Sequence, residues 1–128
     1  MSTLKTNTLT GTTSAGSILV TGEGGSTTTN LQQGLAKCWV GSFDFSDNSV
    51  IDSFNVSTFT DNGNGELITN FSSAMANAGF STTVSDNNYS LIMVAAQATT
   101  STRTDSHTTA FAAWDGAIQK LTVHGDLA

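Results

Sequence analysis

The pattern of apolar and polar residues along the chain changes near residue 38. Residues 1–29 contain no aromatic residue, and their few large apolar side chains are widely spaced. From Cys38 onward, apolar and polar residues alternate with a period of two, which is typical of β-strands with one buried face. The sequence therefore predicts a β-rich domain over 38–128, preceded by a segment with no core of its own.

The alternating region divides into short strands separated by turn residues. The predicted strands are 39–45, 50–60, 66–72, 80–84, 89–98, 108–114 and 117–124, with turns at SDNN (85–88) and DG (115–116). This regular spacing predicts an all-β fold, an antiparallel β-sandwich of about seven strands. We expect consecutive strands to pair as hairpins rather than through parallel crossovers. The polar run at 98–109 is interpreted as a strand end that continues into the largest exposed loop.

Residues 1–29 predict an extended arm with one short strand at 17–21, because they bury too little apolar surface to fold alone. Residues 30–37 predict a short helix, since Thr29 or Asn30 suits the N-cap and leucines recur at helical spacing. Two helical turns containing Gly34 are unstable in isolation. We expect this helix either to pack on its own domain or to form a small bundle on a trimer axis. The residues expected to make anchoring or trimer contacts are Leu4, Leu9, Ile18, Val20, Leu31 and Leu35.

The polarity of the chain comes from hydroxyls and amides rather than from charge. Ser and Thr account for 38 of the 128 residues, alongside twelve Gly and no Pro, whereas the net charge is only −6. This composition offers no basic surface for nucleic acid. No apolar run is long enough for a membrane span or a signal peptide, so we expect synthesis in a cytoplasm and no membrane insertion. The single cysteine, Cys38, predicts a buried and unreactive thiol.

The turn Asp61–Glu66, DNGNGE, concentrates four oxygen-bearing side chains and suggests two interpretations. Calcium takes six to eight oxygen ligands from loops with a fixed ligand order, and this stretch supplies about half that number. Two Asn-Gly pairs also supply the positive φ angles that a tight hairpin needs. Because both flanks alternate as strands do, the sequence predicts a hairpin tip rather than a metal site.

Catalytic chemistry is not indicated by the sequence. His107 and His124 lack metal-ligand spacing to a cysteine or carboxylate, and no serine lies in a nucleophile motif. Asp44, Asp47 and Asp52 could serve as paired acids for cleaving a glycan, but the first two flank a turn where aspartate is an ordinary residue. We therefore expect a protein without catalytic, cofactor-binding or metal-binding residues, and not an enzyme.

Three stretches resemble a known protein family. They are STTTNLQQGLAKCWV, DSFNVSTFTDNGNGELITNFSSAM and the end of the last predicted strand, with matches over 30–40, 52–71 and 123–126. In these stretches the chain resembles a module repeated in tail fibres and other virion appendages of marine and related bacteriophages. The resemblance covers nearly the whole chain. It departs from the family pattern in the loop GSFDFSDNSV and at His124, which takes a usually apolar place.

The resemblance implies a structural protein of the virion surface, often a homotrimer, whose partners are other virion proteins of the tail or capsid. We expect a fibre-like, tail-associated protein anchored by residues 1–29. Because the chain runs from Met1 to residue 128 as one module, a capsid decoration protein is an open alternative. A second alternative is a receptor- or glycan-binding module for host adsorption that uses loops around 44–49 and 98–109. Its receptor-facing residues would be Asp47, Asn48, Arg103 and His107.

Overall fold

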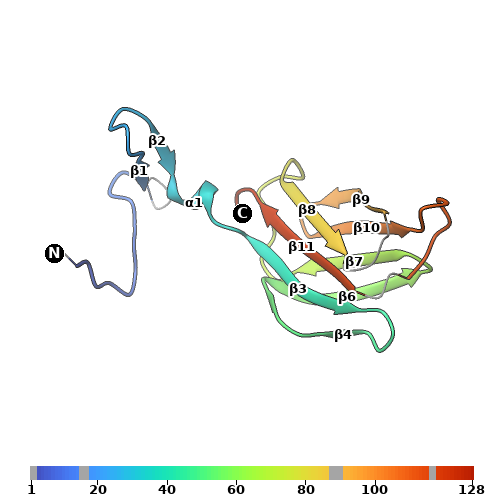
Figure 1. Cartoon of the computed structure of the whole chain (residues 1–128). Helices are drawn as coiled ribbons and strands as arrows, with labels where there is room; N and C mark the ends of the chain where they lie inside the picture. The colour runs from blue at the N-terminus through green and yellow to red at the C-terminus, as the bar shows by residue number, and fades with distance from the viewer. Residues whose placement is uncertain (1–2, 15–17, 87–90, 116–117) are drawn as a thin grey trace. The chain divides into compact units, whose positions relative to one another are not determined.

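The computed structural model describes residues 3–14, 18–86, 91–115 and 118–128. The chain divides into two compact units, Met1–Leu35 and Ala36–Ala128, and each is described by itself (Figure 1). The turn residues predicted at 87–88 and 116 lie outside the described residues.

The N-terminal unit contains one short hairpin. β1 (Leu19–Thr21) pairs antiparallel with β2 (Thr28–Asn30), and the amide of Gly22 donates to the carbonyl of Thr27 (2.9 Å) at the turn. The strand predicted at 17–21 corresponds to β1, whereas β2 was not predicted. Its three residues, TTN, are all polar, so no apolar alternation marks them as a strand.

The predicted two-turn helix is only one turn long. α1 spans Leu31–Gly34, and Asn30 Oδ1 caps it by accepting a hydrogen bond from the amide of Gln32 (2.8 Å). Of the two predicted caps, Thr29 and Asn30, the structure has Asn30, and the predicted length over 30–37 was wrong. Gly34 ends the helix, as expected from its low helix propensity, and β3 begins at Cys38.

The second unit is an antiparallel β-sandwich, as the sequence predicted (Figure 1). The first sheet has the order β4-β3-β11-β8, with β5 also paired to β3, and the second sheet has the order β6-β7-β10-β9. The strand bounds are β3 Cys38–Asp44, β4 Ser49–Val50, β5 Ser53–Phe54, β6 Val56–Gly63, β7 Glu66–Phe71, β8 Ser81–Asp86, β9 Leu91–Ala98, β10 Ser101–His107 and β11 Ile118–His124.

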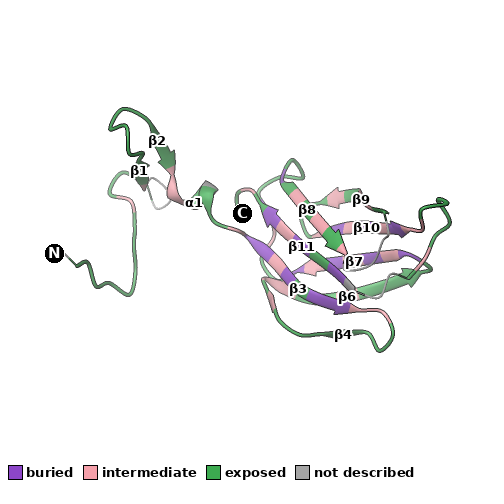
Figure 2. Ribbon diagram, viewed as in Figure 1, coloured by how far each residue is buried: buried purple, intermediate pink, exposed green. Residues whose placement is uncertain are grey.

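The core lies between the central strands of the two sheets. Buried residues concentrate on β3, β11, β7 and β10, whereas the outer strand β6 is mostly exposed (Figure 2). Phe43 links the sheets, since its ring packs 4.9 Å from the ring of Phe59 on β6 and 5.0 Å from that of Phe45, measured between centroids. The buried apolar residues are Cys38, Val40, Phe43, Leu67, Phe71, Met75, Phe80, Leu121 and Val123.

Four predictions about the strands and their connections were wrong. Residues 101–107 form β10 in the middle of the second sheet, not an exposed loop, and residues 108–114 form turns instead of a strand. The region 50–60 is broken into β4, β5 and β6, with Asn55 at a φ of 57°. β8 pairs with β11 rather than with the next strand, β9, so the expected hairpin between them is a crossing from one sheet to the other.

A polar stripe runs through the interior and explains why β10 was missed. Its inward-facing residues, Thr102, Thr104 and Ser106, are almost completely buried, so the period of two is present in hydroxyl residues rather than in apolar ones. Thr104 Oγ1 donates to Gln119 Oε1 at 2.8 Å. By contrast, the hydroxyls of Thr69, Thr102 and Ser106 have no hydrogen-bond partner within the part of the chain that the structure describes.

Replacing Thr102 by valine is expected to raise the free energy of unfolding by about 1 kcal/mol, because it removes a buried hydroxyl that has no partner and nearly preserves the side-chain shape. Thr104→Val is the matched control, since the hydroxyl of Thr104 is hydrogen bonded to Gln119. We expect this variant to lower the free energy of unfolding by about 1 kcal/mol. Urea unfolding of both variants measures the difference. Equal destabilisation by the two variants would contradict the assignment of an unpartnered hydroxyl.

Candidate functional site

The tip Asp61–Glu66 forms the hairpin that the sequence predicted, between β6 and β7. Gly63 and Gly65 have φ angles of 122° and 83°, so both positions need the freedom of glycine. Asp61 Oδ1 accepts a hydrogen bond from the amide of Gly63 (3.1 Å). One carboxylate oxygen of the tip is therefore hydrogen bonded within the turn itself.

Asn64 and Gly65 of the tip bind a distant loop. Asn64 Nδ2 donates to the carbonyl of Ala113 (3.0 Å), and Asn64 Oδ1 accepts from the amide of Asp115 (3.1 Å). In return, Asp115 Oδ1 accepts from the amide of Gly65 (2.6 Å). These three hydrogen bonds attach the tip to residues 113–115. The side-chain oxygen of Asn64 therefore stabilises the fold.

A small group of charged residues lies on the outer face of the second sheet. The Arg103 guanidinium pairs with both carboxylate oxygens of Asp105, at 3.0 and 3.1 Å, and lies 3.6 Å from Glu66 Oε2. Arg103 and His107 were predicted in a receptor-facing loop, but they project from β10 and are half-buried. The concavity beside His107 measures only about 50 Å³. This arrangement is an ion-pair network, and it leaves little room for a ligand.

The other two predicted receptor-facing residues lie in the turn between β3 and β4. Asp47 and Asn48 are exposed there, and Asn48 has a φ of 55°. Asp47 Oδ1 accepts a hydrogen bond from the amide of Ser49 (3.0 Å). Asn48 lies on the edge of a concavity of about 430 Å³, whose other lining residues are Phe43, Thr58, Phe59 and Asp61.

Asp44 and Asp52, which were considered for glycan cleavage, accept hydrogen bonds from backbone amides. Asp44 accepts hydrogen bonds from the hydroxyl (2.7 Å) and the amide (2.8 Å) of Ser46, and these hydrogen bonds hold the pKa of Asp44 below its usual value. Asp52 Oδ1 accepts from the amide of Ser53 (2.8 Å). A glycosidase acid needs a raised pKa, so Asp44 is poorly suited to that role.

Cys38 is completely buried, as the sequence predicted. Burial raises the pKa of its thiol to about 12, so the group stays protonated and unreactive near neutral pH. Within the described ranges, no three His, Cys, Asp or Glu side chains come together as a metal site would require. The same part of the chain contains no helix with the length and apolarity to cross a membrane.

The predicted anchor residues are largely exposed on the N-terminal unit. Leu4 and Leu9 lie in a segment without regular structure, where 79% and 55% of their surfaces are exposed. Ile18 and Leu31 are half-buried beside each other, since the amide of Leu31 donates to the carbonyl of Ile18 (2.8 Å). The exposed large apolar residues of this unit are Leu4, Leu9, Leu19, Val20 and Leu35, of which Leu19 was not among the predicted contacts.

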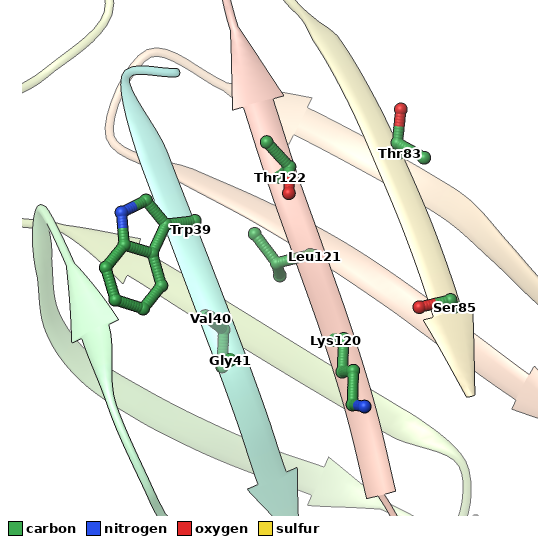
Figure 3. Close-up of a pocket in the computed structure, with 8 residues that line it drawn as sticks. All are labelled: Trp39, Val40, Gly41, Thr83, Ser85, Lys120, Leu121 and Thr122. Carbon is green, nitrogen blue, oxygen red and sulfur yellow. The ribbon is translucent and has the colours of Figure 1, made fainter. Parts of the chain in front are cut away.

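Another concavity, of about 350 Å³, lies on the outer face of the first sheet. Three strands contribute to it: Trp39 and Gly41 come from β3, Lys120 and Thr122 from β11, and Thr83 and Ser85 from β8 (Figure 3). The register places Trp39 opposite Thr122 and Thr122 opposite Thr83, while Lys120 is opposite Ser85.

The sequence interpretation missed this surface because it assigned the aromatic residues to the core. Cys38 and Val40 point inward, so Trp39 between them must point outward. Gly41, the next outward residue, has no side chain, and a Cβ there would lie 3.7 Å from Trp39 Cζ3. The same Cβ would lie 3.3 Å from the carbonyl oxygen of Asp52, so the indole and this carbonyl flank Gly41 on the edge of the concavity. Strict use of the period of two over 38–41 would have found this outward tryptophan.

No protein-family model, curated protein or solved structure matches this chain. Its function is therefore inferred from the properties of the two units: an N-terminal unit with exposed apolar side chains, and a sandwich with its own core.

Proposed function

We propose that this protein is a non-enzymatic structural protein of a bacteriophage virion surface, a trimeric, fibre-like appendage protein attached through its N-terminal unit. The observation that carries the proposal is the exposure of the large apolar residues in that unit. Leu4, Leu9, Leu19 and Leu35 each expose more than half of their surface. A segment that leaves most of its large apolar side chains exposed is typical of one that becomes covered in an assembly.

The structure of the sandwich also supports attachment through the N-terminal unit alone. It buries its own apolar residues between two sheets, so it can keep its fold while the N-terminal unit binds elsewhere. The resemblance over 30–40, 52–71 and 123–126 supports a virion role in particular. A capsid decoration protein would use the same anchor, so the position on the particle distinguishes that alternative from a tail-associated role.

Removing the apolar anchor is expected to release the protein from its assembly. We expect the triple variant Leu4→Ser, Leu9→Ser, Leu35→Ser to sediment as a monomer at micromolar concentration, where the wild type sediments as a trimer, because serine removes the apolar surface that trimer contacts would cover. Deletion of residues 1–29 should also abolish incorporation into virions, measured on purified particles, and leave a folded sandwich by circular dichroism.

The matched control is Ile51→Ser, which removes an apolar side chain that is 84% exposed on the sandwich instead of on the N-terminal unit. It should leave both trimer formation and virion incorporation unchanged. A wild-type chain that sediments as a monomer would refute the trimer, and normal incorporation of the truncated chain would refute the anchor. Immunogold labelling of particles then separates tail from capsid.

A further inference from the structure

We propose that the concavity on the outer face of the first sheet binds an acidic saccharide, with Trp39 as the platform for a sugar ring and Lys120 as the partner of its anionic group. This binding site differs from the loops that the sequence suggested for receptor contacts. It also does not depend on the virion role, since every residue involved belongs to the sandwich.

Trp39 provides the apolar part of the site. Its side chain is half-buried on an outer sheet face, not in the core, and it lines the concavity together with Gly41, which has no side chain. Figure 3 shows the indole on β3 and the Lys120 side chain on the neighbouring strand, β11. A flat aromatic surface that remains accessible can pack against the C–H face of a sugar ring, as aromatic groups do in pockets with a few polar partners.

Lys120 provides the charge. The chain has only four Lys and Arg residues against ten Asp and Glu. Lys37 is buried and Arg103 pairs with Asp105, while Lys5 belongs to the N-terminal unit. Lys120 is exposed and has no ion pair within the described part of the sandwich. Its position in this concavity therefore attracts an anion to a protein that is otherwise acidic.

The lining of the concavity completes the match to a saccharide. The described residues that line it include no carboxylate, which would compete for Lys120. Thr83, Ser85 and Thr122 present hydroxyls that can both donate and accept hydrogen bonds, as sugar hydroxyls do. The volume of about 350 Å³ falls within the range of roughly 300–1,000 Å³ that is usual for small-ligand sites. A pocket with one cation, three hydroxyls and one aromatic face suits a charged sugar better than an apolar ligand.

The test uses the full chain and three oligosaccharide probes. Trigalacturonate carries carboxylates, its methyl ester is the same sugar without charge, and a sulfated galactan trisaccharide carries sulfates. We expect isothermal titration calorimetry to show binding of an acidic probe about tenfold tighter than of the methyl ester, which is the effect expected from one charge-assisted hydrogen bond. The carboxylated and sulfated probes identify which anionic group is preferred. Amide shifts in NMR spectra should localise to residues 39–41, 83–85 and 120–122.

Two variants separate the roles of the two side chains. Lys120→Gln should remove the preference for the acidic probe over the methyl ester, whereas Lys5→Gln, with the same change in net charge, should retain it. Trp39→Ala should weaken binding of every probe by at least about tenfold. Lys120 is exposed, so its variant keeps the test decisive even if Trp39→Ala fails to fold by circular dichroism.

Four results would overturn the proposal. They are no binding of any probe at millimolar concentration, equal affinity for the acid and its methyl ester, equal effects of Lys120→Gln and Lys5→Gln, and NMR shifts that map away from the concavity. Equal effects of the two lysine variants would mean unspecific attraction of anions by the whole chain. None of these results affects the anchor role of the N-terminal unit, which sedimentation and virion incorporation test separately.

Discussion

Gly65→Ala is expected to lower the free energy of unfolding by about 2–5 kcal/mol, a large part of the total stability of a domain this size. Gly65 has a φ of 83°, where any side chain adds strain. A Cβ at this position would also overlap the carbonyl oxygen of Ser106 and lie 3.0 Å from the amide nitrogen of Trp114. These are backbone atoms and cannot rotate away as a flexible side chain would.

The consequences of that overlap extend beyond one contact. The carbonyl of Gly65 accepts a hydrogen bond from the amide of Ser106 (2.7 Å), and its amide donates to Asp115 (2.6 Å). Moving the tip to make room for a methyl group therefore breaks its attachment to β10 and to the loop at 113–115. Urea unfolding, followed by circular dichroism, measures the loss.

Gly63→Ala is the matched control, because it lies in the same tip with a φ of 122° and has no atom within 4 Å of an added Cβ. It should lose only the strain of the backbone conformation, about 1–2 kcal/mol. If the two variants were equally destabilised, the close approach of β10 to the tip would not be the cause.

Phe43→Ala is expected to lower the free energy of unfolding by about 3–5 kcal/mol, the usual cost of truncating a buried phenylalanine. Phe43 is 1% exposed. Its ring packs on Phe45, which directly follows β3, and on Phe59 in the second sheet. Its removal leaves a cavity at a point where the two sheets meet.

The control for this variant is Phe54→Ala on β5. Phe54 also pairs with β3 in the first sheet, but half of its surface is exposed. Phe54→Ala should lower the free energy of unfolding by less than about 1.5 kcal/mol, since this side chain buries much less apolar surface than Phe43 does. Similar losses for Phe43→Ala and Phe54→Ala in urea unfolding would contradict the central position assigned to Phe43.

The sequence predicted those parts of the fold in which apolar and polar residues alternate. β3, β7 and β9 lie close to their predicted positions, and the tip between β6 and β7 followed from its Asn-Gly pairs. β10 could not be predicted in this way, because its buried positions are Thr102, Thr104 and Ser106. Serine and threonine are also common in exposed loops, so their pattern alone does not predict a buried strand. Their burial follows from the position of β10 between β7 and β9.

The candidate binding surface was harder to predict for a different reason. Its residues come from β3, β8 and β11, which are far apart in the sequence and neighbours only in the sheet. The outward direction of Trp39 follows from local alternation, but its proximity to Lys120 depends on a register that includes an irregularity between Gln119 and Leu121. Pattern alone fixes which face a residue occupies and leaves its cross-strand neighbours open.

The hydroxyl-lined interior has a consequence for how the sandwich responds to temperature. Among the described residues, seven polar side chains are buried beside nine apolar ones. Exposure of apolar surface on unfolding raises the heat capacity, whereas exposure of polar surface lowers it. Mixed burial therefore gives a smaller heat-capacity change, and a flatter curve of stability against temperature, than an all-apolar interior of the same size would. Such a domain loses less of its stability on cooling, because less of that stability comes from apolar burial, which weakens in the cold.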